Sequence, residues 1–359
     1  MGMSNKIIKN NKNHNDGITL HRNSIIAEKI VFLDGISGTG KTMMAPILSS
    51  YDNIEIGSFE YIRECICILS EMDKIDENTA IHLLNINADA TLFNSVIGRH
   101  TNFRYDDLSS VFNTSKKLKY FKRILSSYSG KAILDQIKDK KPHSLIITHQ
   151  LLPSIDIAFK AYNERLRIIE TVRHPLYTIE NWYRGLKQCR PGEDPRNFTV
   201  WFKHKSYCLP WYAKGWEEKY CNSNTMDRAI YALNLLTDLG NKKIDLLDPN
   251  QKEKILILPF EKFVIEPFSW IERINSLIGE QLSKSTKKEL KKQKCPRKLV
   301  TDGPAKKIYM KYGWKKPLKT EKEVYEDKIN FVKRRSSKEG LDKLMEMCID
   351  YENRYGKWF

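Results

Sequence analysis

The chain has 359 residues, of which 41% are hydrophobic and 11% aromatic, a composition that can bury a full core and excludes an intrinsically disordered protein. Lysine and arginine number 61 against 44 acidic residues, and the resulting net charge of +17 would attract anionic ligands. No apolar run could span a membrane, no secretion signal is visible, and the seven cysteines lack the paired spacing of a zinc site. We expect a soluble cytoplasmic protein with reduced thiols, no metal and no membrane span.

Apolar runs alternate with helical periodicity along the chain, and this predicts an α/β fold. Residues 1–26 are polar and without periodicity, so we expect a disordered tail there. Short apolar runs predict strands at 30–33, 53–57, 144–148, 166–172 and 254–258. Helical spacing predicts helices throughout 61–138 and at 226–239, 270–278, 321–334 and 337–354. The expected architecture is a three-layer sandwich with a central, mainly parallel sheet, a helical insertion and C-terminal helices.

The segment 35–42, GISGTGKT, follows the first predicted strand and precedes a predicted helix. Its glycines let backbone amides approach an anion, and the N-terminus of the helix adds partial positive charge. Lys41 can reach a terminal anionic oxygen, and Thr42 can bond a phosphate or hold Mg²⁺. The sequence therefore predicts a phosphate-binding loop of the P-loop kind. Its expected binding residues are Gly35, Ser37, Gly38, Thr39, Gly40, Lys41 and Thr42.

Two further residues of interest follow predicted strands, His149 after the third and Arg173 after the fourth. Because the carboxyl ends of parallel strands meet at one edge of a sheet, we expect both residues beside the loop. His149 is a candidate general base, since an imidazole can accept a proton near neutral pH; a structural histidine bonded to a carbonyl is the alternative. Arg173 offers a planar donor fork for an anion, and a surface salt bridge is its alternative.

Taken together, these stretches resemble the sulfotransferase family, whose members transfer a sulfuryl group from 3′-phosphoadenosine-5′-phosphosulfate (PAPS). The resemblance is carried by GISGTGKT, by Thr148-His149 with Leu and Pro after it, by Arg173-His-Pro175 and by ILILPFEKFVIEPFSWIERINSLIG. The CPRK stretch at 295–298 is a weaker match. The resemblance covers about residues 28–303 and implies a P-loop-like fold, PAPS as the donor and no required metal.

The resemblance implies which residues would hold the donor. Arg173 and Asn181 would hold its 3′-phosphate, with Asn181 standing where the family usually has serine. Arg297 and Lys298 would supply a second basic contact to that phosphate. The loop would hold the 5′-phosphosulfate.

The resemblance also implies two possible bases. In the cytosolic branch of the family the histidine of the Thr-His motif is the base, which here is His149. In the glycan-modifying branch a glutamate just after the second strand takes this role, and Glu60 lies near that place, about two residues out of register. Family members usually carry Lys or Arg where this chain has Ile36, so we expect Lys41 to supply the catalytic cation.

The expected domain organisation is a sulfotransferase-like α/β domain at 27–303 and a helical extension at 304–359. Within the domain, 61–138 is the helical insertion, and 187–224 is an aromatic, loop-rich region expected on the acceptor side. The expected partners are a nucleotide donor and an acceptor with a hydroxyl or amine, either a glycan or a small molecule. The basic chain and the aromatic loop favour a carbohydrate acceptor.

Two other functions stay open on the sequence alone. A P-loop small-molecule kinase using ATP and Mg²⁺ would also carry GISGTGKT, although no later apolar strand ends in a convincing aspartate to help hold Mg²⁺: 144–148 is followed by His149 and 166–172 by Arg173. A nucleic-acid-binding protein would fit the net charge of +17, but no recognisable nucleic-acid motif occurs. Sulfuryl transfer is the favoured function, without nucleic acid as a partner.

Overall fold

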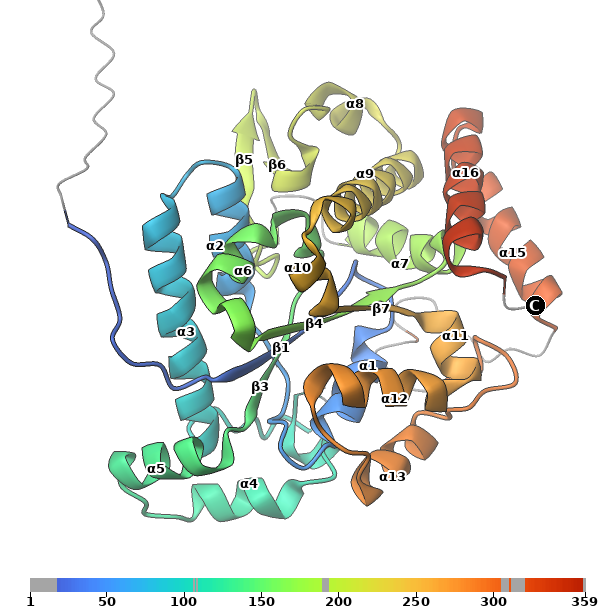
Figure 1. Ribbon diagram of the computed structural model, residues 1–359. Coiled ribbons are helices and arrows are strands. Elements are labelled where there is room, and N and C mark those ends of the chain that lie inside the picture. Colours follow the sequence, from blue (N-terminus) through green and yellow to red (C-terminus); the bar gives the residue numbers. More distant parts are fainter. Residues whose placement is uncertain are drawn as a thin grey trace, which may run out of the picture.

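The fold comes from a computed structural model, which describes residues 18–105, 107, 109–188, 194–304, 310 and 320–357 (Figure 1). The predicted disordered tail lies mostly outside the described residues, as does the first part of the predicted C-terminal extension. In the described part of the chain, no helix is both long enough and apolar enough to cross a membrane.

In the described residues, five parallel strands form the central sheet, in the order β2-β3-β1-β4-β7. They are β1 (Lys29–Asp34), β2 (Ser58–Phe59), β3 (His143–Ile147), β4 (Leu166–Val172) and β7 (Ile255–Pro259). The central strand β1 pairs with β3 and β4, and Leu33 lies opposite both Ile147 and Ile169. The predicted parallel sheet is thus confirmed. Since parallel strands end at the same edge, the segments after β1, β3 and β4 lie next to one another.

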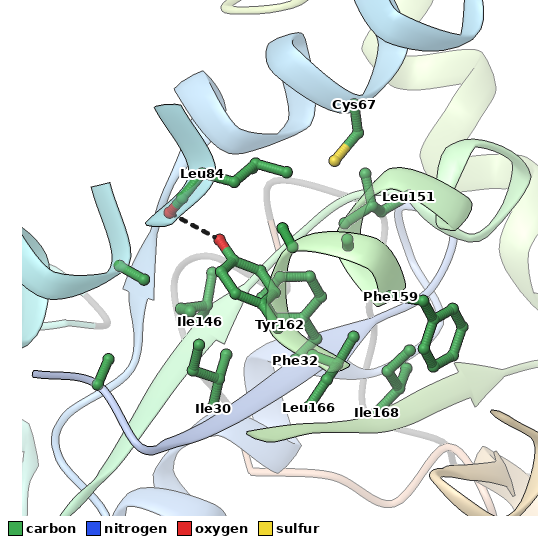
Figure 2. Packing of buried hydrophobic residues seen from close by; sticks show 14 of the residues in the cluster. Ile30, Phe32, Cys67, Leu84, Ile146, Leu151, Phe159, Tyr162, Leu166 and Ile168 are labelled. Atoms are coloured by element: carbon green, nitrogen blue, oxygen red, sulfur yellow. Dashed lines mark hydrogen bonds between the residues drawn. The ribbon is translucent and has the colours of Figure 1, made fainter. Parts of the chain in front are cut away.

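Helices cover both faces of the sheet, as expected for a parallel sheet whose strands are apolar on both sides. One face packs against α2 (Tyr61–Glu71), α3 (Glu77–Ile97) and α6 (Asp156–Tyr162). The other packs against α1 (Lys41–Ser49), α11 (Phe260–Ile265), α12 (Pro267–Ile278) and α13 (Lys284–Lys292). Figure 2 shows the first face, where Phe32 of β1 contacts Tyr162, whose hydroxyl donates to the carbonyl of Leu84 at 3.1 Å.

A third cluster of helices lies beyond the end of β4 (Figure 1). It contains α7 (Pro175–Gln188), α9 (Thr225–Leu246), α15 (Glu321–Lys333) and α16 (Lys338–Tyr355). The two amphipathic helices predicted near the C-terminus are therefore confirmed, and they pack on the helix that follows Arg173. The remaining α-helices of the described residues are α4 (Lys117–Ile124), α5 (Gly130–Lys140), α8 (Glu217–Asn222) and α10 (Pro249–Glu253).

The predicted second strand, 53–57, is wrong in position. Only Ile54 makes a bridge there, to His143, and the strand β2 begins at Ser58. Side chains from elsewhere take the amides that a ladder would need: the Tyr120 hydroxyl accepts from the amide of Ile56 at 2.9 Å, and the Ser49 hydroxyl accepts from Gly57 at 3.1 Å. Those amides are satisfied without a neighbouring strand.

The aromatic region 187–224 is more ordered than predicted. It contains an antiparallel hairpin of β5 (Trp201–His204) and β6 (Tyr207–Pro210). Leu209 and Tyr220 form a small apolar cluster at its base. Side chains do not alternate between buried and exposed along either of these strands, so the period-two pattern that predicts a strand is missing.

Candidate functional site

The glycine loop connects β1 to α1 at the edge where the strands end. Gly40 caps α1 in a left-handed conformation with φ +109°, which favours glycine. A Cβ atom at this position would lie 2.3 Å from a ring carbon of Phe260. Glycine is therefore required twice over, by the backbone conformation and by the aromatic ring seated against the loop.

Lys41 lies beneath the loop, and only 6% of its surface is exposed. Its ammonium donates to the carbonyl oxygens of Gly35 and, at 3.2 Å, Ile36. Burial lowers the pKa of Lys41, while the nearby carboxylates of Asp34 and Glu170 act in the opposite direction. Lys41 is thus bonded in this structure to the loop's own carbonyls, and its catalytic role stays a prediction.

Asp34, the last residue of β1, bonds to the segment that follows β3. Its carboxylate accepts from the Thr148 hydroxyl at 2.8 Å and from the amides of Leu151 and Leu152 at 2.8 and 2.9 Å. On the other side, the Thr171 hydroxyl of β4 donates to the backbone carbonyl of Asp34 at 3.0 Å. The ends of all three strands are therefore bonded together. Sequence reasoning missed Asp34, although an acid at the end of an apolar strand was a visible signal.

Arg173 and Asn181, the residues predicted to hold a second phosphate, both lie against the loop. The Arg173 guanidinium donates from Nη1 to the carbonyl of Gly38 at 3.1 Å. A Cβ atom at Gly38 would approach the Asn181 amide nitrogen to 3.2 Å. Next to Asn181, the Trp182 indole donates to the carbonyl of Ser37 at 3.0 Å. Arg173, just before α7, and Trp182 of α7 are thus bonded to the loop, and Asn181 lies against it.

Phe260, the first residue after β7, stacks between two arginines. The Arg173 guanidinium carbon lies 4.4 Å from its ring centroid and that of Arg297 lies 5.6 Å away. The Arg297 guanidinium also donates to the carbonyl of Val300 at 2.9 Å. Lys298 is exposed, and no hydrogen bond or ion pair joins it to the loop among the described residues. The structure thus brings Arg297 to the site's border and leaves Lys298 pointing to solvent.

His149 is fixed by a buried carboxylate. One oxygen of Glu64 accepts from the His149 backbone amide at 3.0 Å and contacts the ring nitrogen Nδ1 at 3.1 Å. Because that oxygen is an acceptor, we assign the hydrogen of the ring to Nδ1, which leaves Nε2 as the proton-accepting nitrogen. Burial raises the pKa of Glu64, and the hydrogen bond from His149 acts against that rise.

Aromatic rings surround the imidazole of His149. Phe59 and Tyr61 lie nearly parallel to it, with centroids 5.4 and 5.8 Å away. Phe198, from the predicted acceptor-side region, lies 5.1 Å from Tyr61. Tyr61 and Phe198 are both exposed, so an apolar, flat surface adjoins the candidate base.

Glu60, the second candidate base, is close in sequence to these rings but makes a different contact. Its carboxylate accepts from the Ser58 hydroxyl at 2.9 Å. The acid that contacts His149 is Glu64, one helical turn further along α2. Sequence reasoning missed Glu64, which lies in the first turn of α2, whereas Glu60 comes just before that helix.

The described residues contain no group of three or more His, Cys, Asp or Glu side chains that could hold a metal ion. The strands on either side of β1 end in Thr148 and His149 in one case and in Val172 and Arg173 in the other. Besides the buried carboxylates of Asp34, Glu64 and Glu170, the groups at the site are amides, hydroxyls and cations, which bind anions.

No protein-family model matches the chain, and no curated protein sequence matches it either. Several solved structures align with most of this chain at low similarity. The sulfotransferase domain of the Synechococcus PCC 7002 olefin synthase has a TM-score of 0.45 and 11% identity, covering 92% of this chain and 96% of that one. Sulfotransferase STF9 from Mycobacterium avium has a TM-score of 0.42 and 10% identity, covering 94% and 79%. A sulfotransferase from Alicyclobacillus acidocaldarius has a TM-score of 0.36 and 12% identity, covering 89% and 95%.

These neighbours are sulfotransferases. They share the family that the sequence motifs resemble, but identities near 11% and TM-scores below 0.5 carry no conclusion about activity. The residues of the site itself must support any function.

Proposed function

We propose that this chain is a sulfotransferase that moves a sulfuryl group from PAPS to an acceptor hydroxyl or amine. One observation carries the proposal: the Arg173 guanidinium bonds the carbonyl of Gly38, so two anion-binding devices adjoin each other. The first is the amide-rich loop at the start of α1, and the second is Arg173 with Asn181. A nucleotide with phosphate groups at both its 5′ and 3′ positions can bind to both devices.

The donor supplies the sulfuryl group on its 5′-phosphate. Loop residues Gly38 to Thr42 hold that end, while Arg173 and Asn181 bind the 3′-phosphate, with Arg297 behind the Phe260 ring as a further cation. The buried ring of Phe260 lies close to both arginines. The bonds from Arg173 and Trp182 to the loop, and the position of Asn181 against Gly38, support these assignments.

His149 is the proposed base. Its Nε2 accepts the proton of the acceptor hydroxyl as the hydroxyl oxygen forms its bond to sulfur and the bond from sulfur to the bridging phosphate oxygen breaks. The electron pair of the broken bond stays on that phosphate oxygen. Lys41 and the loop amides stabilise the developing charge, for which Lys41 must exchange the carbonyls of Gly35 and Ile36 for the donor.

The exposed rings of Tyr61 and Phe198 support an acceptor with a flat face, such as a sugar ring, that places its hydroxyl at His149. His149 follows β3 and Arg173 follows β4, on opposite sides of β1 and its loop. The acceptor would therefore bind near the end of β3, and the 3′-phosphate of the donor near the end of β4.

Calorimetric titration tests the donor. Adenosine 3′,5′-bisphosphate should bind tightly in EDTA, and radiolabelled PAPS should then pass its sulfate to members of an acceptor panel. If the protein instead binds ATP only with Mg²⁺ and ignores the bisphosphate, the proposal is wrong and the kinase reading replaces it. Binding of nucleic acid with a steep salt dependence, without nucleotide binding, would favour the third reading.

A further inference from the structure

The carboxylate of Glu261 links the C-terminal helix α16 to Arg173. Glu261 follows Phe260 at the start of α11, and 1% of it is exposed. One of its oxygens accepts from the Tyr351 hydroxyl of α16 at 2.7 Å. The other accepts from the backbone amide of His174 at 3.1 Å and lies 3.8 Å from Nε of Arg173. Three distant segments of the chain therefore meet at this one buried carboxylate.

The energetics of the carboxylate depend on these partners. Burial raises the pKa of Glu261, while Arg173 and the hydrogen bond from Tyr351 act against that rise. A buried carboxylate keeps its charge only when it is paired and hydrogen-bonded. Removing the Tyr351 hydroxyl would leave one oxygen unpartnered and favour the neutral acid, which no longer attracts the guanidinium.

In the described residues, the other contacts of Arg173 are with a backbone carbonyl and with the aromatic rings of Phe260 and Tyr177. Its Nη1 donates to the Gly38 carbonyl, and its guanidinium carbon lies 4.4 Å from the centroid of the Phe260 ring. Its ionic partner is the carboxylate of Glu261. Tyr351 and Arg173 also border the same cavity, of about 90 Å³, behind the loop. The angle at which the guanidinium faces a phosphate is therefore set in part by a residue of α16.

We propose that Tyr351 is a positioning residue which, through Glu261, orients Arg173 for the 3′-phosphate of the donor and so gives α16 a part in donor selectivity. This inference rests on the proposed function. Tyr351 does not touch the donor in this scheme. Through Arg173, it affects how much more tightly the protein binds a nucleotide with a 3′-phosphate than one without it.

The test compares two ligands in the full-length chain. Calorimetry gives the dissociation constants of adenosine 3′,5′-bisphosphate and adenosine 5′-monophosphate, and their ratio measures recognition of the 3′-phosphate. In Tyr351→Phe we expect the affinity for the bisphosphate to fall about tenfold, the loss expected for one hydrogen bond to a charged group, with the monophosphate unchanged. Glu261→Gln should likewise weaken binding of the bisphosphate relative to the monophosphate.

Tyr355→Phe is the matched control. Tyr355 is one turn further along α16 and its ring lies 4.8 Å from that of Tyr351, but its hydroxyl is not bonded to Glu261. This control should keep the wild-type ratio. Equal losses for both nucleotides in Tyr351→Phe, or an unchanged ratio in both Tyr351→Phe and Glu261→Gln, overturn the inference while leaving the donor site standing. Failure of the wild-type protein to bind either nucleotide overturns the proposed function and the inference with it.

Discussion

The backbone amide and the imidazole of His149 bond to the same oxygen of Glu64, at 3.0 and 3.1 Å. Two bonds to one buried acceptor fix both the position of the residue and the rotation of its ring. A proton acceptor held in this way loses little freedom when a hydroxyl approaches. The same pair fixes the tautomer, because the hydrogen on Nδ1 is the one that faces the carboxylate.

His149→Ala should lower kcat by a factor of about 10² to 10⁴ without changing donor affinity, because only proton transfer is lost. Glu64→Ala should also lower kcat, by a smaller factor, since the ring stays but its orientation does not. Glu60→Gln is the comparison variant and should keep kcat near that of the wild type. Near-normal turnover in His149→Ala with a large loss in Glu60→Gln would move the base to Glu60.

Arg173→Lys should weaken binding of adenosine 3′,5′-bisphosphate by about tenfold or more. Lysine keeps the charge but loses the planar fork that bonds Gly38 and stacks on Phe260, and one charge-assisted contact contributes about 1.5–3 kcal/mol. Arg184→Lys serves as the control, because Arg184 pairs with Glu180 within α7, the helix that follows Arg173. Equal affinities for the two variants and the wild type would remove Arg173 from the donor site.

Gly40→Ala should destabilise the protein more than Gly215→Ala. Both glycines have positive φ, +109° and +92°, so both substitutions cost about 1–2 kcal/mol of backbone strain. At Gly40 the new methyl also meets the Phe260 ring, whereas at Gly215 nothing lies within 4 Å. Denaturant unfolding measures the difference. Equal losses at the two sites would mean that the ring is not seated firmly on the loop.

Glu55 should make the protein sensitive to acid. Burial alone would raise the pKa of Glu55, but bonds from Arg123 and Lys119 outweigh it and hold that pKa well below the usual range. A carboxyl with a lowered folded-state pKa contributes stability above its unfolded pKa of about 4.3, and this contribution is lost as the pH falls below that value.

Glu55→Gln should therefore have a lower free energy of unfolding at pH 7 and a flatter dependence on pH between about 5 and 2. Glu77→Gln is the control, because the ion pair of Glu77 with Lys160 is exposed and should contribute little. The measurement is urea unfolding across this pH range. Parallel curves for Glu55→Gln and the wild type would contradict the assigned pKa shift.

Much of the fold could be predicted because buried parallel strands leave continuous apolar runs, such as the one around Phe32. The same topology explains why Arg173 could be placed beside the loop from sequence alone: both follow neighbouring strands that end at one edge. The second strand could not be located, because the hydroxyls that accept from the amides of Ile56 and Gly57 belong to Tyr120 of α4 and Ser49 of α1.

The supporting residues of the site were beyond sequence reasoning for a similar cause. Glu64 was overlooked in favour of Glu60: the helical spacing predicts a helix from residue 61, but it does not show that the first acid of this helix faces the end of β3. Tyr351 and Glu261 are far apart along the chain, and their contact depends on how α16 packs on α7. Local patterns reveal elements and loops, whereas contacts across layers require the packed structure.

Asp34 has a consequence for how a ligand would be received. By bonding the ends of three strands to one another, it makes the loops above them a single stiff rim whose amides and hydroxyls are already ordered. An arriving nucleotide would then lose little binding energy to immobilising its host. Lys41 is the exception, because its ammonium would have to release the carbonyls of Gly35 and Ile36 before it could bond a ligand. Ligand binding would then require a change of conformation in this one side chain of an otherwise ordered loop.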